Sequence, residues 1–178
     1  AKSPFTAGHS ERVAEFAVRI GRALGFEEGR ARWLWRSALM HDIGKLGVSN
    51  SILDKPGKLD DEEWRQMRLH PTYTEQILSR INPFREMARI AAAHHEKLDG
   101  TGYPKALAGE DIDLDSRIIT VADIYDALTA DRPYRAGLSV DEALAILDSL
   151  RGTGVDPACL DALVRTLAGE GHALPLAA

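Results

Sequence analysis

The sequence of 178 residues contains a single cysteine, Cys159, and no apolar run that approaches the length of a membrane span. One cysteine excludes an internal disulfide and is typical of a protein in a reducing compartment. The first residues also lack the pattern of a secretory signal. These absences predict a cytoplasmic protein with no membrane span in this segment.

The sequence also lacks an excess of basic residues. Its 22 Lys and Arg stand against 27 Asp and Glu, which gives a net charge of −5. This balance argues against a duplex nucleic-acid binder, which usually carries a basic face, and leaves room for a local pocket for a small phosphorylated ligand.

The length is that of one domain with a sizeable core. The chain opens at Ala1, without methionine, in what already looks like structured sequence. We therefore expect residues 1–178 to be one domain excised from a longer protein, with an upstream regulatory domain.

Helical patterns occupy most of the chain. Apolar residues recur at three- and four-residue steps from Val13 to Leu24, and Ile77, Leu78 and Ile81 are predicted to form the core side of another helix. Capping boxes are predicted at 60–63 and 139–142, and further helices over 31–40, 84–94, 118–128, 139–152 and 156–167. Residues 96–115, rich in glycine, proline and polar residues, predict a long loop. We expect an all-α fold, a single compact helical bundle.

The chain has six histidines, and five of them fall at element ends or beside acidic residues: His9, His41, His70, His94 and His95. Taken singly, each is more often a packed or surface residue than a ligand. Neighbours on a helix point about 100° apart, so the adjacent His94 and His95 reach one ion only near a helix end. Together the five predict a metal site.

Two aspartates strengthen that prediction. Asp42 directly follows His41 and is placed to bridge two ions. Asp123 is the one acid in the apolar stretch 118–123, where an unpaired buried carboxylate is costly. A metal would satisfy Asp123, and so would an arginine such as Arg117 or Arg132.

Several linked motifs resemble the HD-GYP subgroup of the HD phosphohydrolase superfamily, over about residues 6–156. They are His-Asp-Ile-Gly-Lys at 41–45, His-His-Glu at 94–96, Asp-Gly-Thr-Gly-Tyr-Pro at 99–104, Val-Ala-Asp-Ile-Tyr-Asp-Ala-Leu at 121–128 and Arg-Pro-Tyr-Arg at 132–135. The resemblance implies an HD-domain bundle in which the Gly-Tyr-Pro sequence lies in the long loop.

The resemblance also implies hydrolysis of cyclic di-GMP, a bacterial second messenger, to pGpG or on to GMP. Two divalent metal ions, iron or manganese, would hold a bridging hydroxide that attacks phosphorus. Carried over by position, one metal would be held by His9, His41, Asp42 and Asp123. Asp42 would bridge to a second metal held by His70, His94 and His95.

Further roles follow from the same motifs. Lys45 is the natural cation for a phosphate oxygen and joins Asp42 as a catalytic residue, although a solvated surface lysine is the alternative. Arg132 and Arg135 are expected at the second phosphate or a guanine, with surface salt bridges nearly as common. Asp126, one turn after Asp123, is expected to contact guanine or a metal-bound water.

The loop Gly102-Tyr103-Pro104 leaves three interpretations open. Tyr103 would stack on a guanine base, a diguanylate-cyclase (GGDEF) domain would dock on the loop, or the ring would simply pack in the core.

Phe5 stands where some members carry a glutamate that helps a third metal, so we expect a binuclear site.

Two other functions fit the same residues. One is a phosphodiesterase for another cyclic or linear dinucleotide, such as cyclic GMP-AMP. The other is a regulatory module that binds cyclic di-GMP and partner proteins with little turnover.

Overall fold

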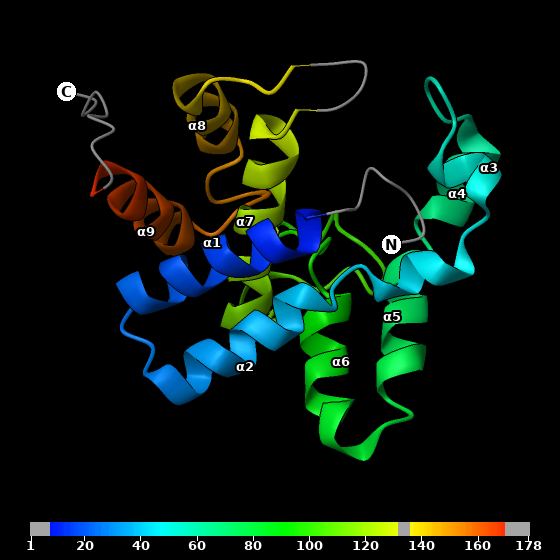
Figure 1. Ribbon diagram of the computed structural model, residues 1–178, viewed down its shortest axis with the longest axis horizontal. Coiled ribbons are helices and arrows are strands. Elements are labelled where there is room, and N and C mark those ends of the chain that lie inside the picture. The colour runs from blue at the N-terminus through cyan, green and yellow to red at the C-terminus, as the bar shows by residue number, and fades with distance from the viewer. Residues whose placement is uncertain (1–7, 132–135, 170–178) are drawn as a thin grey trace.

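The computed structural model describes residues 8–131 and 136–169, and within these ranges the regular secondary structure is helical, apart from one isolated β-bridge between Arg151 and Val155. The all-α prediction is therefore confirmed (Figure 1). In chain order the elements are α1 (His9–Ala23), α2 (Glu28–Leu39), η2 (Ile43–Gly47), α3 (Asn50–Leu53), α4 (Asp61–Met67), α5 (His70–Leu78), η3 (Asn82–Phe84), α6 (Arg85–Ala92), η4 (Gly109–Asp111), α7 (Leu114–Thr129), α8 (Val140–Ser149) and α9 (Pro157–Ala168).

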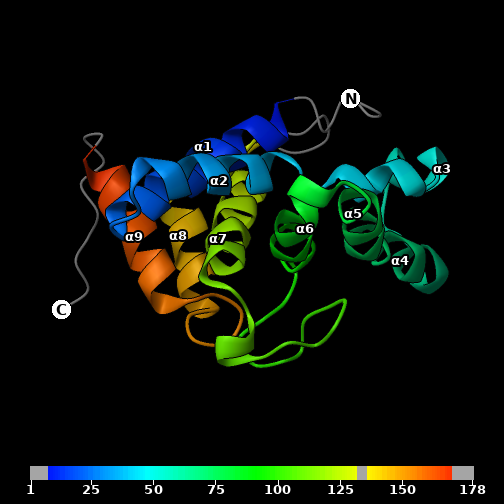
Figure 2. The ribbon, with the colours of Figure 1, turned by 90° about the horizontal axis from the view of Figure 1, so that it is seen from below.

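The longest helix, α7, forms the centre of the fold and packs against α1, α6, α8 and α9 (Figure 2). Its apolar stretch predicted from the sequence is buried, with Ile118, Ile119 and Val121 fully inaccessible to solvent. Removing such side chains from water is the main stabilising contribution to a bundle of this size. The central position of α7 brings its polar residues against the first turn of α1.

A second, smaller core joins α5 to α6. It consists of Leu78, Ala88 and Ala91, with Met40, Ile43 and Phe84 packed against them. The turn η2 lies directly on α5: a Cβ atom added to Gly44 would stand 1.9 Å from the backbone oxygen of His70. Only glycine allows this approach. The small core therefore fixes the segment after α2 against the start of α5.

Local sequence signals located most helix ends correctly. Both predicted capping boxes form, at Asp60 with Glu63 and at Ser139 with Glu142. The prediction for Ile81 was wrong, because its side chain is 47% exposed. Helix α5 ends at Leu78, so the helical spacing that put Ile81 on the core side does not continue to it.

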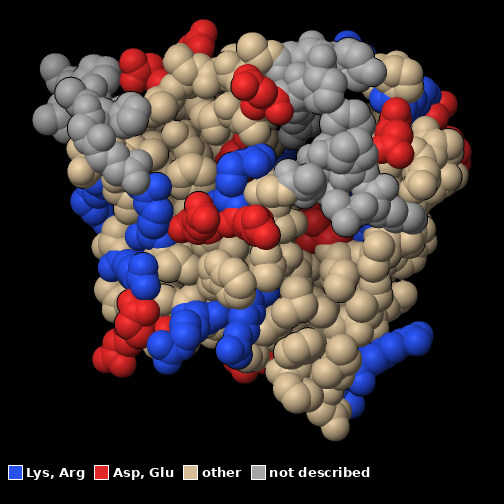
Figure 3. Space-filling view, in the orientation of Figure 1, with Lys and Arg blue, Asp and Glu red and all other residues tan. Residues whose placement is uncertain are grey.

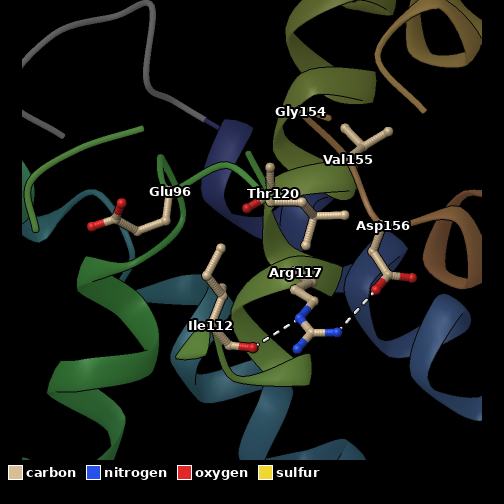
Figure 4. A pocket seen from close by; sticks show the side chains of 8 residues that line it. Glu96, Ile112, Arg117, Thr120, Gly154, Val155 and Asp156 are labelled. Carbon is tan, nitrogen blue, oxygen red and sulfur yellow. Dashed lines mark hydrogen bonds and ion pairs between the residues drawn. The ribbon is translucent and has the colours of Figure 1, made fainter. Parts of the chain in front are cut away.

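The predicted long loop follows α6 and is tied down at both ends. The buried carboxylate of Glu96 accepts hydrogen bonds from the backbone N–H groups of Lys105 (2.7 Å) and Leu107 (3.0 Å). Further along, the Arg117 guanidinium donates to the Ile112 carbonyl (2.8 Å) and pairs with Asp156 (3.1 Å), beside a small pocket (Figure 4). These contacts hold the loop between α6 and α7.

Within the described ranges, no helix has the length and apolar composition needed to cross a bilayer. On the face seen in Figure 3, basic and acidic side chains are interspersed over α1 and α2, while the end formed by α5 and α6 shows few charges.

Candidate metal centre

The residues predicted to bind metal come from five separated parts of the chain, and all except Asp123 lie at or next to helix ends. His9 is the first residue of α1, and His70 is the first residue of α5. His41 and Asp42 follow α2 directly, and the pair His94–His95 follows α6. Asp123 projects from the middle of α7. The adjacent His94 and His95 lie just past the end of α6, the position expected if both are to reach one ion.

Three of the histidines share one local geometry. In His41, His70 and His94, Nδ1 lies 2.6, 2.7 and 2.6 Å from the backbone oxygen three residues earlier. A carbonyl can only accept a hydrogen bond, so Nδ1 carries the proton and donates it. The lone pair of each ring is then on Nε2, which is the arrangement found in metal-ligating histidines.

The carboxylate of Asp42 lies between two sets of imidazoles. Its Oδ2 atom is 3.7 Å from His9 Nε2 and 3.5 Å from His41 Nε2. Its Oδ1 atom is 3.4 Å from His70 Nε2 and 3.9 Å from His94 Nε2. One carboxylate therefore presents a different oxygen to each side.

The potential ligand atoms form overlapping groups, each with its atoms within 4.8 Å of one another. We call His9, His41 and Asp123 the α1–α7 group, after the helices that carry its outer members. We call His70, His94 and His95 the α5–α6 group. Asp42 lies beside both and joins His41 and His94 in a third set.

The positions of the imidazole Nε2 atoms favour the binding of cations. The Nε2 atom of His41 is buried and has no hydrogen-bond partner. The Nε2 atoms of His70 and His94 face each other at 3.4 Å, and both carry lone pairs because each Nδ1 donates to a carbonyl. Such an arrangement is repulsive unless a cation lies nearby. Imidazole nitrogens with a shared carboxylate suit divalent first-row metals, so the residues fit the predicted ions.

The protonation states of Asp42, Asp123 and His95 also suit metal binding, which requires ionised carboxylates and neutral imidazoles. Burial favours the neutral acid, yet the nearby His41 and Lys45 hold the pKa of Asp42 well below its usual value. Burial likewise opposes ionisation of Asp123, but a hydrogen bond with His9 lowers its pKa to about 2. In the α5–α6 group, burial lowers the pKa of His95 to about 3.

His9 differs from the other histidines. Burial disfavours its charged form, but hydrogen bonds with Asp123 and Asp126 outweigh that effect and raise its pKa to about 9. The Asp123 carboxylate lies 3.3 Å from His9 Nε2. Of the two arginines considered for Asp123, Arg117 instead binds Asp156, and Arg132 lies outside the described residues.

The residues predicted to bind substrate differ in where they lie relative to the candidate metal centre. Lys45 Nζ lies 2.5 Å from Asp42 Oδ2, within the candidate metal centre. Tyr103 stacks on His95, with ring centroids 4.8 Å apart, and Arg68 lies over the same ring at 5.3 Å. Arg132 and Arg135, like Phe5, lie outside the described residues. The substrate roles of all of these stay predictions.

Asp126 lies within the site, at 2% exposure, and its carboxylate contacts two protein side chains. One is His9 and the other is Arg12, a residue that the sequence did not single out. The available signal was spacing, since Arg12 follows His9 by three positions and so lies on the same side of α1.

Two threonines were also missed. The Thr74 hydroxyl donates to the His41 carbonyl and accepts from the Gly44 N–H, both at 2.9 Å. The Thr120 hydroxyl donates to the His94 carbonyl at 2.8 Å. Each therefore holds the backbone of a metal-ligand candidate, and neither has a sequence signal apart from a small polar residue in a buried helix face.

Comparison with known proteins agrees with this description. The family model of the HD domain matches residues 1–159. The chain is 59% identical over 167 residues to the 3′3′-cGAMP-specific phosphodiesterase 3 of Vibrio cholerae, which covers 94% of this chain and 36% of that protein. It is 43% identical over 162 residues to the cyclic di-GMP phosphodiesterase response regulator RpfG of Xanthomonas campestris pv. campestris, covering 90% and 43%. The solved HDG"Y"P protein Bd1817 of Bdellovibrio bacteriovorus shares the fold, with a TM-score of 0.74 at 22% identity over 94% of this chain and 53% of that one.

Fold and site thus define an all-helical protein with His/Asp groups suited to divalent metals. The chain belongs to the HD-domain family, and the resemblance to its HD-GYP group is confirmed. It spans less than half the length of either phosphodiesterase that it matches.

Proposed function

We propose that this chain is a metal-dependent phosphodiesterase that hydrolyses a cyclic dinucleotide. The observation that carries the proposal is the position of Asp42, whose two oxygens face the α1–α7 and α5–α6 groups separately. Such a shared carboxylate is typical of two-metal sites that act on phosphate esters.

As first substrate candidate we propose 3′3′-cGAMP. The support is the 59% identity to a Vibrio cholerae phosphodiesterase named for that specificity. Cyclic di-GMP, the substrate expected from the sequence motifs, is the second candidate, supported by the 43% identity to RpfG. Both substrates present the same 3′–5′ phosphodiester to the metal centre, so the choice between them would depend on contacts with one base.

In this proposal the α1–α7 group holds one ion, the α5–α6 group holds the other, and Asp42 contacts both. We propose iron or manganese, which accept mixed imidazole and carboxylate ligands. When bound, the two ions would supply Lewis acidity and activate a water for attack on phosphorus.

The chain's own residues would then complete the reaction. The water oxygen would form a bond to phosphorus as the bond from phosphorus to the 3′ ribose oxygen breaks, and a proton from the water would end on that 3′ oxygen, giving a linear dinucleotide with a 5′ phosphate. The Lys45 ammonium, beside Asp42 at 2.5 Å, is close enough to stabilise the negative charge on a phosphate oxygen. Arg132 and Arg135 are proposed to bind the second phosphate or a base, and Tyr103 to border the base.

The test combines metal content with turnover on one sample purified without oxygen. About two ions per chain with hydrolysis of 3′3′-cGAMP, cyclic di-GMP or both would support the proposal, and the ratio of kcat/KM values would rank the substrates. Two ions with tight nucleotide binding and no product would favour the regulatory module. Absence of metal after reconstitution with iron or manganese would contradict the site.

Two predicted partners go with this function. A diguanylate-cyclase domain is proposed to dock on the Gly102-Tyr103-Pro104 loop, and an upstream sensory or receiver domain to control the activity. Binding of an isolated GGDEF domain to the chain and to a Tyr103→Ala variant would test the first.

A further inference from the structure

Asp126 is engaged on both of its oxygens by other side chains. Its Oδ2 atom lies 2.7 Å from His9 Nδ1 and accepts from Arg12 Nη2 at 3.1 Å, while its Oδ1 atom accepts from Arg12 Nε at 2.6 Å. The Arg12 contact is a two-pronged guanidinium–carboxylate pair, the strongest geometry available to these groups. A guanine could take a hydrogen bond from Asp126 only in competition with these contacts.

The contact between Asp126 and His9 also orients the His9 ring. Since Asp126 accepts from Nδ1, the Nε2 atom of His9 is directed toward Asp123 at 3.3 Å and Asp42 at 3.7 Å. The other three described histidines with a fixed Nδ1 use a carbonyl three residues earlier in the chain. His9 instead depends on a side chain 117 positions away, on another helix.

From this difference we infer that Arg12 and Asp126 are positioning residues, which determine how tightly the α1–α7 group holds its metal ion and leave the α5–α6 group unaffected. The inference rests on the metal centre of the proposed function and is independent of which nucleotide is hydrolysed. It also replaces the expected substrate role of Asp126 with a role acting through His9.

The strength of the effect follows from the burial of the pair. Asp126 is almost fully buried, whereas the Arg12 side chain is 43% exposed, so one half-exposed arginine neutralises a carboxylate inside the site. Without Arg12, Asp126 keeps one partner and is free to rotate away from His9. Loss of a partner that orients a metal-ligating histidine typically lowers metal affinity 10- to 100-fold.

A matched control is available at a second arginine–aspartate pair, whose aspartate also lies on α7. Arg30, also half exposed, pairs with the buried Asp115 at 2.6 Å. Asp115 lies eight residues before Asp123 on α7, roughly 12 Å away along the helix axis. Arg30→Ala therefore removes a similar arginine–aspartate pair between an N-terminal helix and α7 without touching the metal centre.

The experiment measures manganese binding to the whole chain in the absence of nucleotide, for the parent, Arg12→Ala, Arg12→Lys, Asp126→Asn and Arg30→Ala. We expect one of two ions to bind 10- to 100-fold more weakly in Arg12→Ala and Asp126→Asn, and the other ion to bind as in the parent. Arg12→Lys, which keeps one of the two prongs, should recover part of the affinity, and so should added guanidinium with Arg12→Ala. Arg30→Ala should bind both ions like the parent.

Two results would overturn the inference. If Arg12→Ala keeps both ions at parental affinity and only raises KM, the pair acts on substrate. If Arg30→Ala weakens metal binding as much as Arg12→Ala, the effect is one of general stability. Selective loss of one ion in Arg12→Ala, in a protein whose parent hydrolyses no cyclic dinucleotide, would support the inference while contradicting the proposed function.

Discussion

The two groups of the candidate metal centre differ in how their outer histidines are oriented, although His41 in the α1–α7 group is held by a backbone carbonyl like His70 and His94. In the α5–α6 group, His70 and His94 are oriented by backbone carbonyls three residues away, within the same short stretch of chain. In the α1–α7 group, His9 is oriented by Asp126 and through it by Arg12, across 117 and 114 positions. A ligand held by its own backbone keeps its orientation whenever its local turn forms. A ligand held by distant side chains depends on correct packing of two helices.

One centre can therefore contain two positions of unequal robustness. The α5–α6 group is also more deeply buried, with His70 and His94 at 2% and 1% exposure. We therefore expect the α1–α7 position to lose its ion first under chelation. Variants that act on one group, on both or on neither can separate the contributions.

The largest effect is expected from Asp42→Ala, because it removes the one carboxylate common to both groups. Both ions and all measurable phosphodiesterase activity should be lost, while the helical circular dichroism signal stays. Elemental analysis and product formation on the same sample check this. An active Asp42→Ala protein with two ions would remove the basis for a shared centre.

Lys45→Ala should separate chemistry from metal binding. Both groups keep their ligands, so two ions per chain are expected, while kcat falls about 10²- to 10³-fold through loss of charge stabilisation at the phosphate. Steady-state kinetics with metal analysis measure both quantities. Loss of metal from Lys45→Ala would mean that the ammonium, 2.5 Å from Asp42, supports the centre itself.

Gly44→Ala tests the junction where the two groups meet. The added Cβ would lie 1.9 Å from the His70 carbonyl oxygen and 2.5 Å from the Thr74 nitrogen, so η2 and α5 must separate. Such overpacking should lower the free energy of unfolding by about 3 kcal/mol, measured by urea denaturation.

The matched control for that variant is Gly29→Ala in α2, where an added Cβ meets nothing within 4 Å. Alanine is the better helix former, so this change should be neutral or should stabilise by up to about 1 kcal/mol. Equal destabilisation by the two substitutions would contradict the close contact at Gly44.

Substitution of Tyr103 should have the smallest effect on metal binding, and this effect should be confined to the α5–α6 group. Its ring stacks on His95 with the planes 28° apart, so Tyr103→Ala should weaken the ion in that group about 10-fold. Tyr103→Phe keeps the stack and should bind metal like the parent. If Tyr103→Ala keeps both ions and changes only KM, the ring acts on the base rather than on His95.

Much of the fold was predictable because its signals are local. Short-range helix geometry accounts for the capping boxes at Asp60 and Ser139. It also accounts for the turn after α6 that brings His94 and His95 together. The error at Ile81 came from extending a helical period beyond the point where α5 ends. Helix ends without a glycine or a capping box leave only weak traces in a sequence.

The partners within the site were less predictable. Asp126 was expected at a base or a water, because it shares a helix face with Asp123, and Arg12 was not considered. A sequence with 22 basic and 27 acidic residues permits many ion pairs, and only the packing of α1 on α7 selects this one.

The sequence by itself determined the all-helical class, the types of ligand and their order along the chain, because helix periodicity, capping and metal preference depend on residues a few positions apart. Tertiary structure alone decided that Asp42 presents a different oxygen to each group, and that His9 depends on Asp126 and Arg12. Those relations join residues on different elements, up to 117 positions apart, and such contacts exist only once the buried faces of the helices have packed together.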